Sequence, residues 1–162
     1  MKKASGFLLF YDNVKGLVKG LAKEKLILVL KDINGKGDFP KGVVEEEKLE
    51  SLIQCAIRET KEETGLIINK DYKIIDNSYF SNKTGLHIFL GKVLCINGNL
   101  PEIKFTKNPI TDIIEHTEYY WLTYEEAYLL LPSYLKKFLK TYKEKLNEQW
   151  RNKNHYIFKQ FQ

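Results

Sequence analysis

Three glutamates and an arginine gather on one short stretch of the chain, in a pattern that could bind a metal ion. Glu59, Glu62 and Glu63 are spaced i, i+3 and i+4, so in a helix their carboxylates project from one side within a turn of each other. Gly65 then ends the helix and leaves the last two acids in its final turn, where the helix dipole disfavours negative charge. The repulsion between neighbouring acids and the unfavourable dipole each cost a few tenths to about 1 kcal/mol, which a solvated helix face tolerates. Alternatively, a hard divalent cation such as Mg²⁺ turns the repulsion into coordination, because it prefers oxygen ligands and shares substrate phosphates.

Arg58 stands directly beside these acids and offers a way to fix the helix in place. Glu50 lies eight residues earlier, about two turns up the same expected helix. An arginine can hold a carboxylate by two parallel hydrogen bonds, so a Glu50–Arg58 pair, or a contact from Arg58 to a strand carbonyl, would set the helix register. The alternative is a surface ion pair, which contributes little.

Hydrophobic patterning indicates the elements that position these side chains. Apolar residues at three- and four-residue spacing predict a helix from about residue 49 to residue 64. Thr123 and Glu126 form a capping-box pattern that opens a second helix through Leu130, after which Pro132 ends it or starts the next. Short apolar runs predict strands at residues 6–11, 25–31, 72–80, 86–96 and 118–122.

A long helix is expected near the carboxyl end of the chain. Its apolar stripe consists of Leu135, Phe138, Leu139, Tyr142, Leu146 and Trp150. Packing of this stripe on the sheet is the ordinary interpretation, with a partner-binding or membrane-surface role as the alternative. The expected fold class is α/β (α+β), a helix–sheet–helix sandwich around a mixed sheet.

Length and composition favour one compact domain. With 162 residues and 43% hydrophobic content the chain can build a single core. No stretch approaches the roughly 20 apolar residues of a membrane span, and the first residues do not form a signal peptide, so a soluble cytoplasmic protein is expected. Cys55 and Cys95 lack the spacing of a zinc site or redox pair and are expected to be buried thiols.

Positive charge concentrates at the carboxyl end. Residues 133–162 hold eight Lys or Arg against two Glu, a net charge of +6, while the rest of the chain carries −1. A basic end favours polyanionic partners, although a solvated helix face would have the same composition.

The segment from Gly42 to Leu66 resembles the signature box of the Nudix hydrolases. That pattern is Gly, five residues, Glu, seven residues, Arg-Glu, an apolar residue, any residue, Glu-Glu, any residue, Gly and an apolar residue. From Glu50 onward the spacing fits, except that Thr60 stands where an aliphatic residue is usual. Seven residues rather than five separate Gly42 from Glu50, which indicates a longer loop before the helix.

The resemblance implies a fold and a chemistry. The fold is an α/β/α sandwich with a mixed sheet. Glu59, Glu62 and Glu63 would bind one or more Mg²⁺ or Mn²⁺ ions, and one carboxylate would help to deprotonate the attacking water. Metal ions neutralise the charge on phosphate oxygens and lower the pKa of a bound water, so cleavage of a phosphoanhydride rests on positioning and electrostatics.

A more specific resemblance connects the chain to the asymmetrical dinucleoside tetraphosphate hydrolases of this family. It rests on residues 3–11, on residues 39–42, on the run from Glu115 to Leu122 and on residues 125–127. The run from Glu115 to Leu122 also resembles the RNA 5′-pyrophosphate hydrolases of this family, and it implies that Glu115, six residues before Trp121, is a metal ligand or base. The segment that contains Lys41 implies that this lysine contacts phosphate. The usual His after Gly42 is absent, since position 43 is Val.

Further candidates complete the expected substrate site. Lys83 is a possible phosphate contact on a turn, and Tyr79 and Tyr119 are aromatic residues near strands that could stack on a nucleobase. Gly42, Glu50 and Gly65 are assigned structural roles.

The sequence leaves the substrate open. The first expectation is a dinucleoside tetraphosphate or another nucleoside polyphosphate. An RNA 5′-end pyrophosphohydrolase or decapping enzyme would combine the same helix with the basic tail, and a nucleotide-sensing module without catalysis is the non-enzyme alternative. We expect a single domain over residues 1–150, a basic, aromatic tail over residues 151–162, and a monomer or weak homodimer.

Overall fold

One mixed sheet forms the centre of the molecule. The computed structural model describes residues 2–13 and 24–144, with the side chains of residues 76–80 outside this description. β1 is antiparallel to β2 and β4 and parallel to β6, so the expected mixed sheet is confirmed. Within the described residues the sheet has seven strands: β1 (Ala4–Asp12), β2 (Lys25–Asp32), β3 (Gly37–Asp38), β4 (Lys41–Val43), β5 (Tyr72–Ser81), β6 (Leu86–Val93) and β7 (His116–Leu122).

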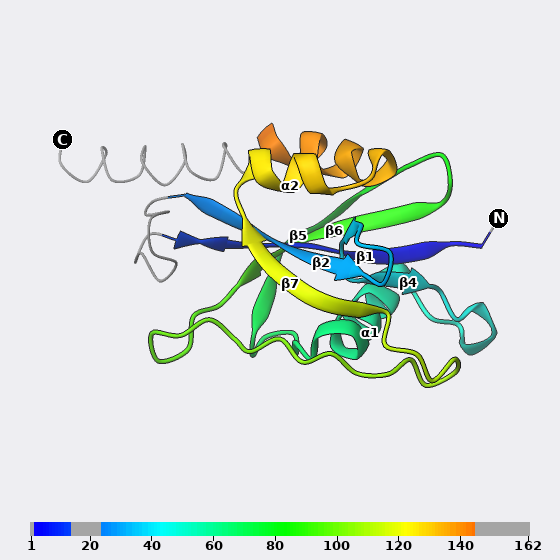
Figure 1. Ribbon diagram of the computed structural model, residues 1–162. Coiled ribbons are helices and arrows are strands. Elements are labelled where there is room, and N and C mark those ends of the chain that lie inside the picture. Colours follow the sequence, from blue (N-terminus) through cyan, green and yellow to red (C-terminus); the bar gives the residue numbers. More distant parts are fainter. Residues whose placement is uncertain (1, 14–23, 145–162) are drawn as a thin grey trace.

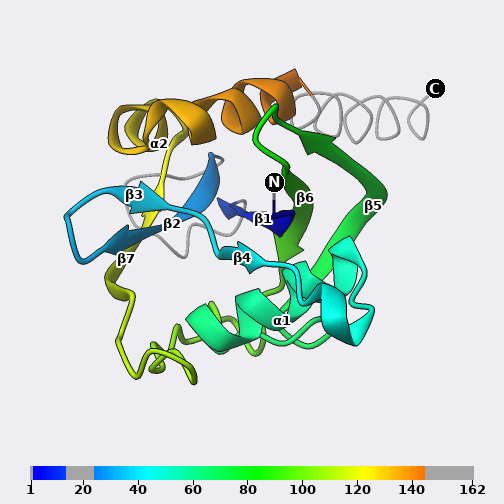
Figure 2. The ribbon, with the colours of Figure 1, turned by 90° about the vertical axis from the view of Figure 1, so that its right-hand side faces the viewer.

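Helices cover both faces of this sheet (Figures 1 and 2). α1 (Leu52–Thr64) lies on one face, and α2 (Tyr124–Leu130) lies on the other, together with a helix over residues 133–144. β1 supplies both cores because successive strand side chains point to opposite faces: Leu8 and Phe10 pack toward α2, and Phe7 and Leu9 pack toward α1. The expected α/β/α sandwich is therefore confirmed.

The C-terminal helices behave largely as the sequence predicts. Thr123 caps α2 with a reciprocal bond to Glu126, which confirms the capping box. The stripe of the following helix is buried at Leu135, Phe138, Leu139 and Tyr142. Leu146, Trp150, the expected domain boundary at residue 150 and the tail over residues 151–162 lie outside the described residues. Within the described residues, no helix has the length and apolar character needed to span a membrane.

The start of α1 corrects the sequence-based expectation. Leu49 was expected in the apolar stripe, but it has a left-handed backbone (φ 55°) and is 91% exposed. The residues before it form a short 3₁₀ turn over Glu46–Lys48, which takes up the longer loop. Ser51 then caps α1 through a capping box with Gln54, so the helix begins at Leu52 and Glu50 precedes it.

Smaller boundary errors occur in the strands. β6 ends at Val93 rather than at residue 96. Cys55 is fully buried, as expected, but Cys95 is only half-buried. β7 begins at His116, two residues earlier than expected, because His116 pairs with Asp32 across a bulge in the β2–β7 ladder. This earlier start brings His116 into the sheet beside the acidic helix.

Candidate functional site

Arg58 organises the acidic face of α1. Its Nε and Nη2 donate to the two oxygens of Glu50 at 2.7 and 3.0 Å, a bidentate pair, and Nη2 also donates to the Val43 carbonyl at 3.0 Å. Its Nη1 donates to Glu59 at 2.9 Å and to Glu62 at 3.2 Å. Both expected roles, the Glu50 pair and the contact with a strand carbonyl, are confirmed. The Arg58 guanidinium thus connects α1 to β4 and to the loop that contains Glu50, and it holds the carboxylates of Glu59 and Glu62.

Glycines at both ends of the site allow close packing. Gly65 ends α1 in a left-handed conformation (φ 78°) and donates to the Lys61 carbonyl, as the sequence predicts. A side chain at Gly42 would place its Cβ 2.0 Å from the carboxyl carbon of Glu59, so glycine lets β4 lie against this acid without displacing its carboxylate. Thr60, which stands where the Nudix signature has an aliphatic residue, is fully buried.

Glu63 is the most deeply placed carboxylate of the three. It is 8% exposed, and the Lys41 backbone N–H donates to its Oε2 at 3.3 Å. Burial, followed by the nearby charges of Asp38 and Glu59, holds the pKa of Glu63 well above its usual range. Burial likewise raises the pKa of Glu59, although Arg58 opposes the shift. Such carboxylates are costly to ionise alone, and a divalent cation would offset that cost.

A buried histidine joins the acidic helix to the sheet. His116 is 3% exposed, with Nε2 3.0 Å from Asp38 Oδ2 and Nδ1 3.8 Å from Glu63 Oε2. Lys41 Nζ lies 3.1 Å from Asp38 Oδ1. Neither Asp38 nor His116 was assigned a role from the sequence, because their partners lie far away along the chain. The sequence features that came closest to indicating them were the segment Pro40-Lys41-Gly42, just after Asp38, and the segment Glu115-His116.

Glu115 lies at the same site, as expected for a fourth acid. It is exposed, and Asn108 Nδ2 donates to its Oε1 at 2.9 Å. One ligand atom from each of Glu63, Glu115 and His116 lies within 4.8 Å of the others. Glu115 also lines an open groove of about 490 Å³ together with Arg58, Glu59, Glu62 and Lys41. The donor set, rich in oxygen, fits a divalent cation.

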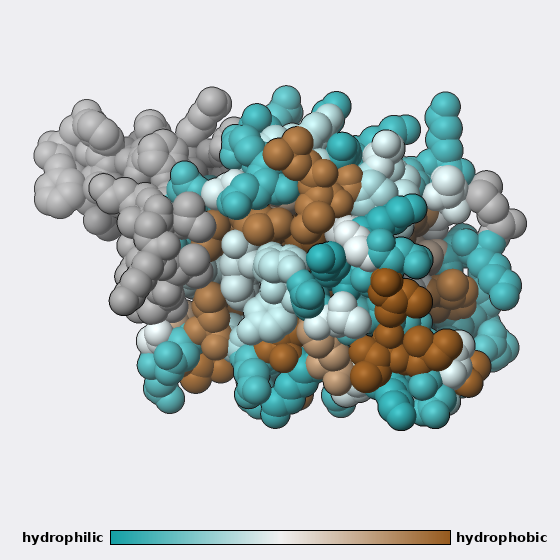
Figure 3. Space-filling model, in the orientation of Figure 1, coloured by the Kyte–Doolittle hydropathy of each residue, from teal (hydrophilic) through white to brown (hydrophobic). Residues whose placement is uncertain are grey.

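Exposed apolar side chains lie along part of the groove, which the sequence did not indicate. Val43 and Ile110 line the groove and are 50% and 88% exposed. Ile113 follows in the same loop and is 53% exposed. Figure 3 shows apolar side chains gathered over this part of the surface, below the sheet. These side chains offer an exposed apolar surface beside the acidic face of α1.

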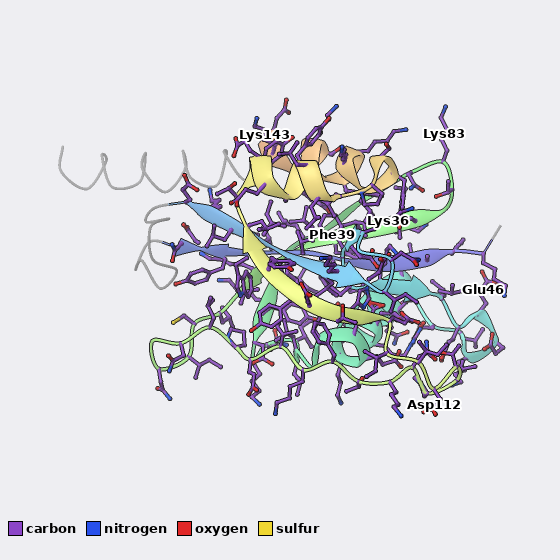
Figure 4. The ribbon with its side chains drawn as sticks, viewed as in Figure 1. Lys36, Phe39, Glu46, Lys83, Asp112 and Lys143 are labelled. Carbon is purple, nitrogen blue, oxygen red and sulfur yellow. The ribbon has the colours of Figure 1, made fainter. Side chains whose placement is uncertain are left out.

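Some expected substrate residues lie elsewhere. Lys83 is in the β5–β6 turn beside Lys137, and Figure 4 places it on the α2 side of the sheet, away from Glu46, which lines the groove. Tyr119 is 39% exposed and packs 6.2 Å from the ring of Phe105, a residue beside the acidic cluster. The side chain of Tyr79 lies outside the described residues.

The raised pKa of Glu63 predicts a pH-dependent stability. In the unfolded chain this group ionises near 4.5, while in the folded, metal-free protein it keeps its proton to higher pH. The raised pKa of Glu63 therefore stabilises the folded protein fully below pH 4.5, and this stabilisation is lost as the pH rises through the pKa of Glu63 in the folded state. Each unit between the unfolded and folded pKa corresponds to about 1.4 kcal/mol of the free energy of unfolding. In Glu63→Gln this loss is absent.

Thermal unfolding with EDTA between pH 4 and pH 8 tests this expectation. The unfolding free energy of Glu63→Gln minus that of the wild type should increase with pH. Adding Mn²⁺ should reverse the trend, because a cation binds the ionised form. A difference that stays constant with pH would show that Glu63 ionises normally in the folded protein.

Comparison with known proteins agrees with this geometry. The NUDIX domain family model matches residues 16–145. The mRNA-decapping protein g5R of African swine fever virus is 36% identical over 112 residues in the Pig/Kenya isolate and 33% identical in the Warthog/Namibia isolate. These matches cover 63% of this chain and 44% of each viral protein, so the chain spans less than half the length of these relatives.

Solved structures show the same fold. A binary complex of the C. elegans Ap4A hydrolase has a TM-score of 0.67 at 21% identity, covering 90% of this chain and 99% of that one. The NUDIX domain of Shewanella oneidensis NrtR, complexed with ADP ribose, has a TM-score of 0.58 at 14% identity, with coverages of 90% and 88%. At these identities the likeness concerns the fold. Since the family match extends over most of the 162 residues, the chain belongs to the Nudix family.

Proposed function

We propose that the chain is a divalent-metal-dependent hydrolase that cleaves a phosphoanhydride bond in a nucleoside polyphosphate. The observation that carries this proposal is the convergence of four carboxylates, Glu59, Glu62, Glu63 and Glu115, around one small pocket, which shares Glu59, Glu62 and Glu115 with the groove. Membership of the Nudix family supports it. When bound, Mg²⁺ or Mn²⁺ would neutralise phosphate charge and lower the pKa of a water molecule.

Side chains of the chain would bind the cation, accept a proton from the attacking water and bind the substrate phosphates. Glu59, Glu62, Glu63 and Glu115 would hold the cation, and one of these carboxylates would accept the proton of the attacking water. Arg58 keeps Glu59 and Glu62 in place through its hydrogen bonds. Lys41 lines the groove and carries a positive charge toward substrate phosphates.

An RNA 5′ end is the first candidate substrate. The sequence relatives at 33–36% identity are named as mRNA-decapping proteins. An RNA substrate would extend beyond the groove and require a second contact surface. We define the basic face as Lys136, Lys140 and Lys143 with the rings of Tyr124 and Tyr128.

The basic face has the composition of a single-strand binding surface. Lys136 and Lys140 lie 4.7 and 5.4 Å from the centre of the Tyr128 ring, and Lys143 lies 4.4 Å from that of Tyr124. The two rings stack at 6.2 Å. No ion pair involves these three lysines within residues 2–13 and 24–144. Lysines beside aromatic rings, with no carboxylate partner in the described part of the chain, suit a phosphate backbone with unstacked bases.

Tyr134 connects this face to the groove. It lies on the helix that carries the three lysines, and its ring is 5.8 Å from Lys41 Nζ. A strand whose 5′ phosphates lie at Lys41 could therefore pass Tyr134 on its way to the basic face, which lies on the α2 side of the sheet (Figure 4).

A dinucleoside tetraphosphate is the second candidate. The Pro40-Lys41-Gly42 and Glu115-His116 segments favour it, because they resemble the hydrolases of that substrate and both segments lie at the acidic groove.

A substrate panel with product detection by mass spectrometry tests the proposal. We expect divalent-dependent release of a capping nucleotide from capped RNA, or of pyrophosphate from triphosphorylated RNA. Preferential cleavage of diadenosine tetraphosphate into ATP and AMP would move the assignment to the second candidate. Hydrolysis of no substrate would support a nucleotide-sensing module instead.

A triple variant separates the two substrates. We expect the variant that combines Lys136→Ala, Lys140→Ala and Lys143→Ala to have a KM roughly tenfold or more higher for an RNA of about thirty nucleotides. The slope of log KM against log salt concentration should decrease by about two, because three phosphate contacts are removed. Cleavage of diadenosine tetraphosphate should not change. The matched control is the triple Ala variant of the exposed Lys36, Lys70 and Lys73, with the same charge change. Equal effects of both variants on RNA would argue against a specific basic face.

A further inference from the structure

His116 presents one ring nitrogen to the acidic site. Its Nε2 lies within hydrogen-bond distance of Asp38, whereas its Nδ1 is 3.8 Å from Glu63 Oε2, too long for a hydrogen bond. The side chain is 97% buried and cannot turn toward solvent. Nδ1 is therefore the nitrogen that faces Glu63, and His116 and Glu63 line a small pocket together with Glu59, Glu62 and Glu115. One ligand atom from each of His116, Glu63 and Glu115 lies within 4.8 Å of the others, close enough for a shared ion.

Asp38 holds the imidazole ring of His116 from its far side. The distance from Nε2 to Asp38 Oδ2 is 3.0 Å, so a hydrogen bond to this carboxylate occupies Nε2. The second oxygen of Asp38 pairs with Lys41 Nζ at 3.1 Å and accepts the Phe39 backbone N–H at 2.9 Å, so this carboxylate is fixed in place. A ring held in this way by Nε2 leaves Nδ1 on the side of Glu63. Metal-binding histidines commonly have this arrangement, in which a carboxylate orients the ring from its far side.

We propose that His116 Nδ1 is a nitrogen ligand of the divalent cation at this site, with Glu63 and Glu115 as oxygen ligands and Asp38 as the residue that positions the ring. This inference rests on the proposed function, which requires the cation. Its consequence is a metal preference: Mg²⁺ favours oxygen donors, whereas imidazole suits transition metals, so the site should prefer Mn²⁺ to Mg²⁺.

The competing arrangement is a purely structural one. A doubly protonated His116 would donate from both nitrogens, bridging Asp38 and Glu63 as an ion pair without contacting a metal. Both arrangements explain why the ring is buried, but only the first places nitrogen in the coordination sphere of the ion.

Pulsed EPR of Mn²⁺ bound to the full chain distinguishes the two arrangements. We expect ¹⁴N modulation from a directly coordinated imidazole in the wild type and its loss in His116→Gln. The Mn²⁺ affinity of that variant should fall by at least tenfold, and its preference for Mn²⁺ over Mg²⁺ should shrink. Asp38→Asn should keep a nitrogen signal but lose about 10–100-fold in affinity, as for other residues that orient a ligand. His87→Gln, at a histidine bonded to Ser81 in β5, is the control and should match the wild type.

Each outcome has a separate meaning. Bound Mn²⁺ without ¹⁴N coupling in the wild type would overturn the role of His116 and leave the metal-dependent hydrolase intact. Failure of the wild type to bind Mn²⁺ would overturn both. Because the decisive signal is measured on the wild type, the test holds even if a variant does not fold.

Discussion

Glu63→Gln is expected to reduce kcat by roughly 10³-fold, the size of effect seen when a preorganised charged or polar group at a reacting centre is removed. Glutamine has nearly the shape of glutamate, so it should fit the same buried position and still accept the Lys41 N–H bond. What it lacks is the negative charge. The loss should therefore reflect the missing charge at the cation site rather than a change of packing.

Steady-state kinetics with Mg²⁺ and with Mn²⁺, together with Mn²⁺ titration, measure this effect. Glu102→Gln, the same chemical change at an exposed position outside the site, is the matched control and should retain wild-type kcat. Activity of Glu63→Gln within about twofold of the wild type would remove the basis for the metal site, since this residue is the most buried of the acids.

Gly42→Ala is expected to have the second-largest effect, about a 10²-fold loss of kcat. The new methyl group would meet the Glu59 carboxyl carbon at 2.0 Å. β4 cannot easily move away, because Gly42 pairs with Ser5 of β1 and its carbonyl accepts from Cys55 Sγ at 3.4 Å. Glu59 must shift instead, and a displacement of about 1 Å at a reacting centre can cost about 10²-fold in rate.

A double-mutant cycle with Glu59→Asp tests this steric cause. Aspartate withdraws the carboxylate by one methylene, so adding Gly42→Ala to Glu59→Asp should cost little more than Glu59→Asp alone. The Mn²⁺ affinity should follow the same pattern. If the two losses simply multiply, the effect of Gly42→Ala does not act through Glu59, and a general distortion of β4 is responsible.

Local sequence rules were sufficient for the helix that carries the acids. The spacing of Glu59, Glu62 and Glu63 and the stop at Gly65 depend on residues within a few positions of each other, and the structure has them as expected. The capping box at Thr123 is equally local. The Glu50–Arg58 pair was also correct, although Glu50 precedes the helix rather than belonging to it.

The start of that helix was set by its N-cap residue, which the periodicity of apolar residues does not show. Leu49 fits the apolar spacing, yet Ser51 with Gln54 satisfies the backbone N–H groups of the first turn, so the helix begins after them. The residues between Gly42 and Ser51 fold into a separate 3₁₀ turn and leave Leu49 in solvent. Hydrophobic patterning alone assigned this residue to the wrong element.

The sequence by itself determined which side chains share one face of α1, namely the three acids and the arginine that holds them, and which glycine ends the helix. Only the tertiary structure decided their surroundings. Asp38 and His116 are 78 residues apart and meet because β3 and β7 both pair with β2. The sheet likewise separates Lys83 from the groove. Spacing along a helix fixes which side chains share a face, whereas contacts between strands depend on the register of the whole sheet.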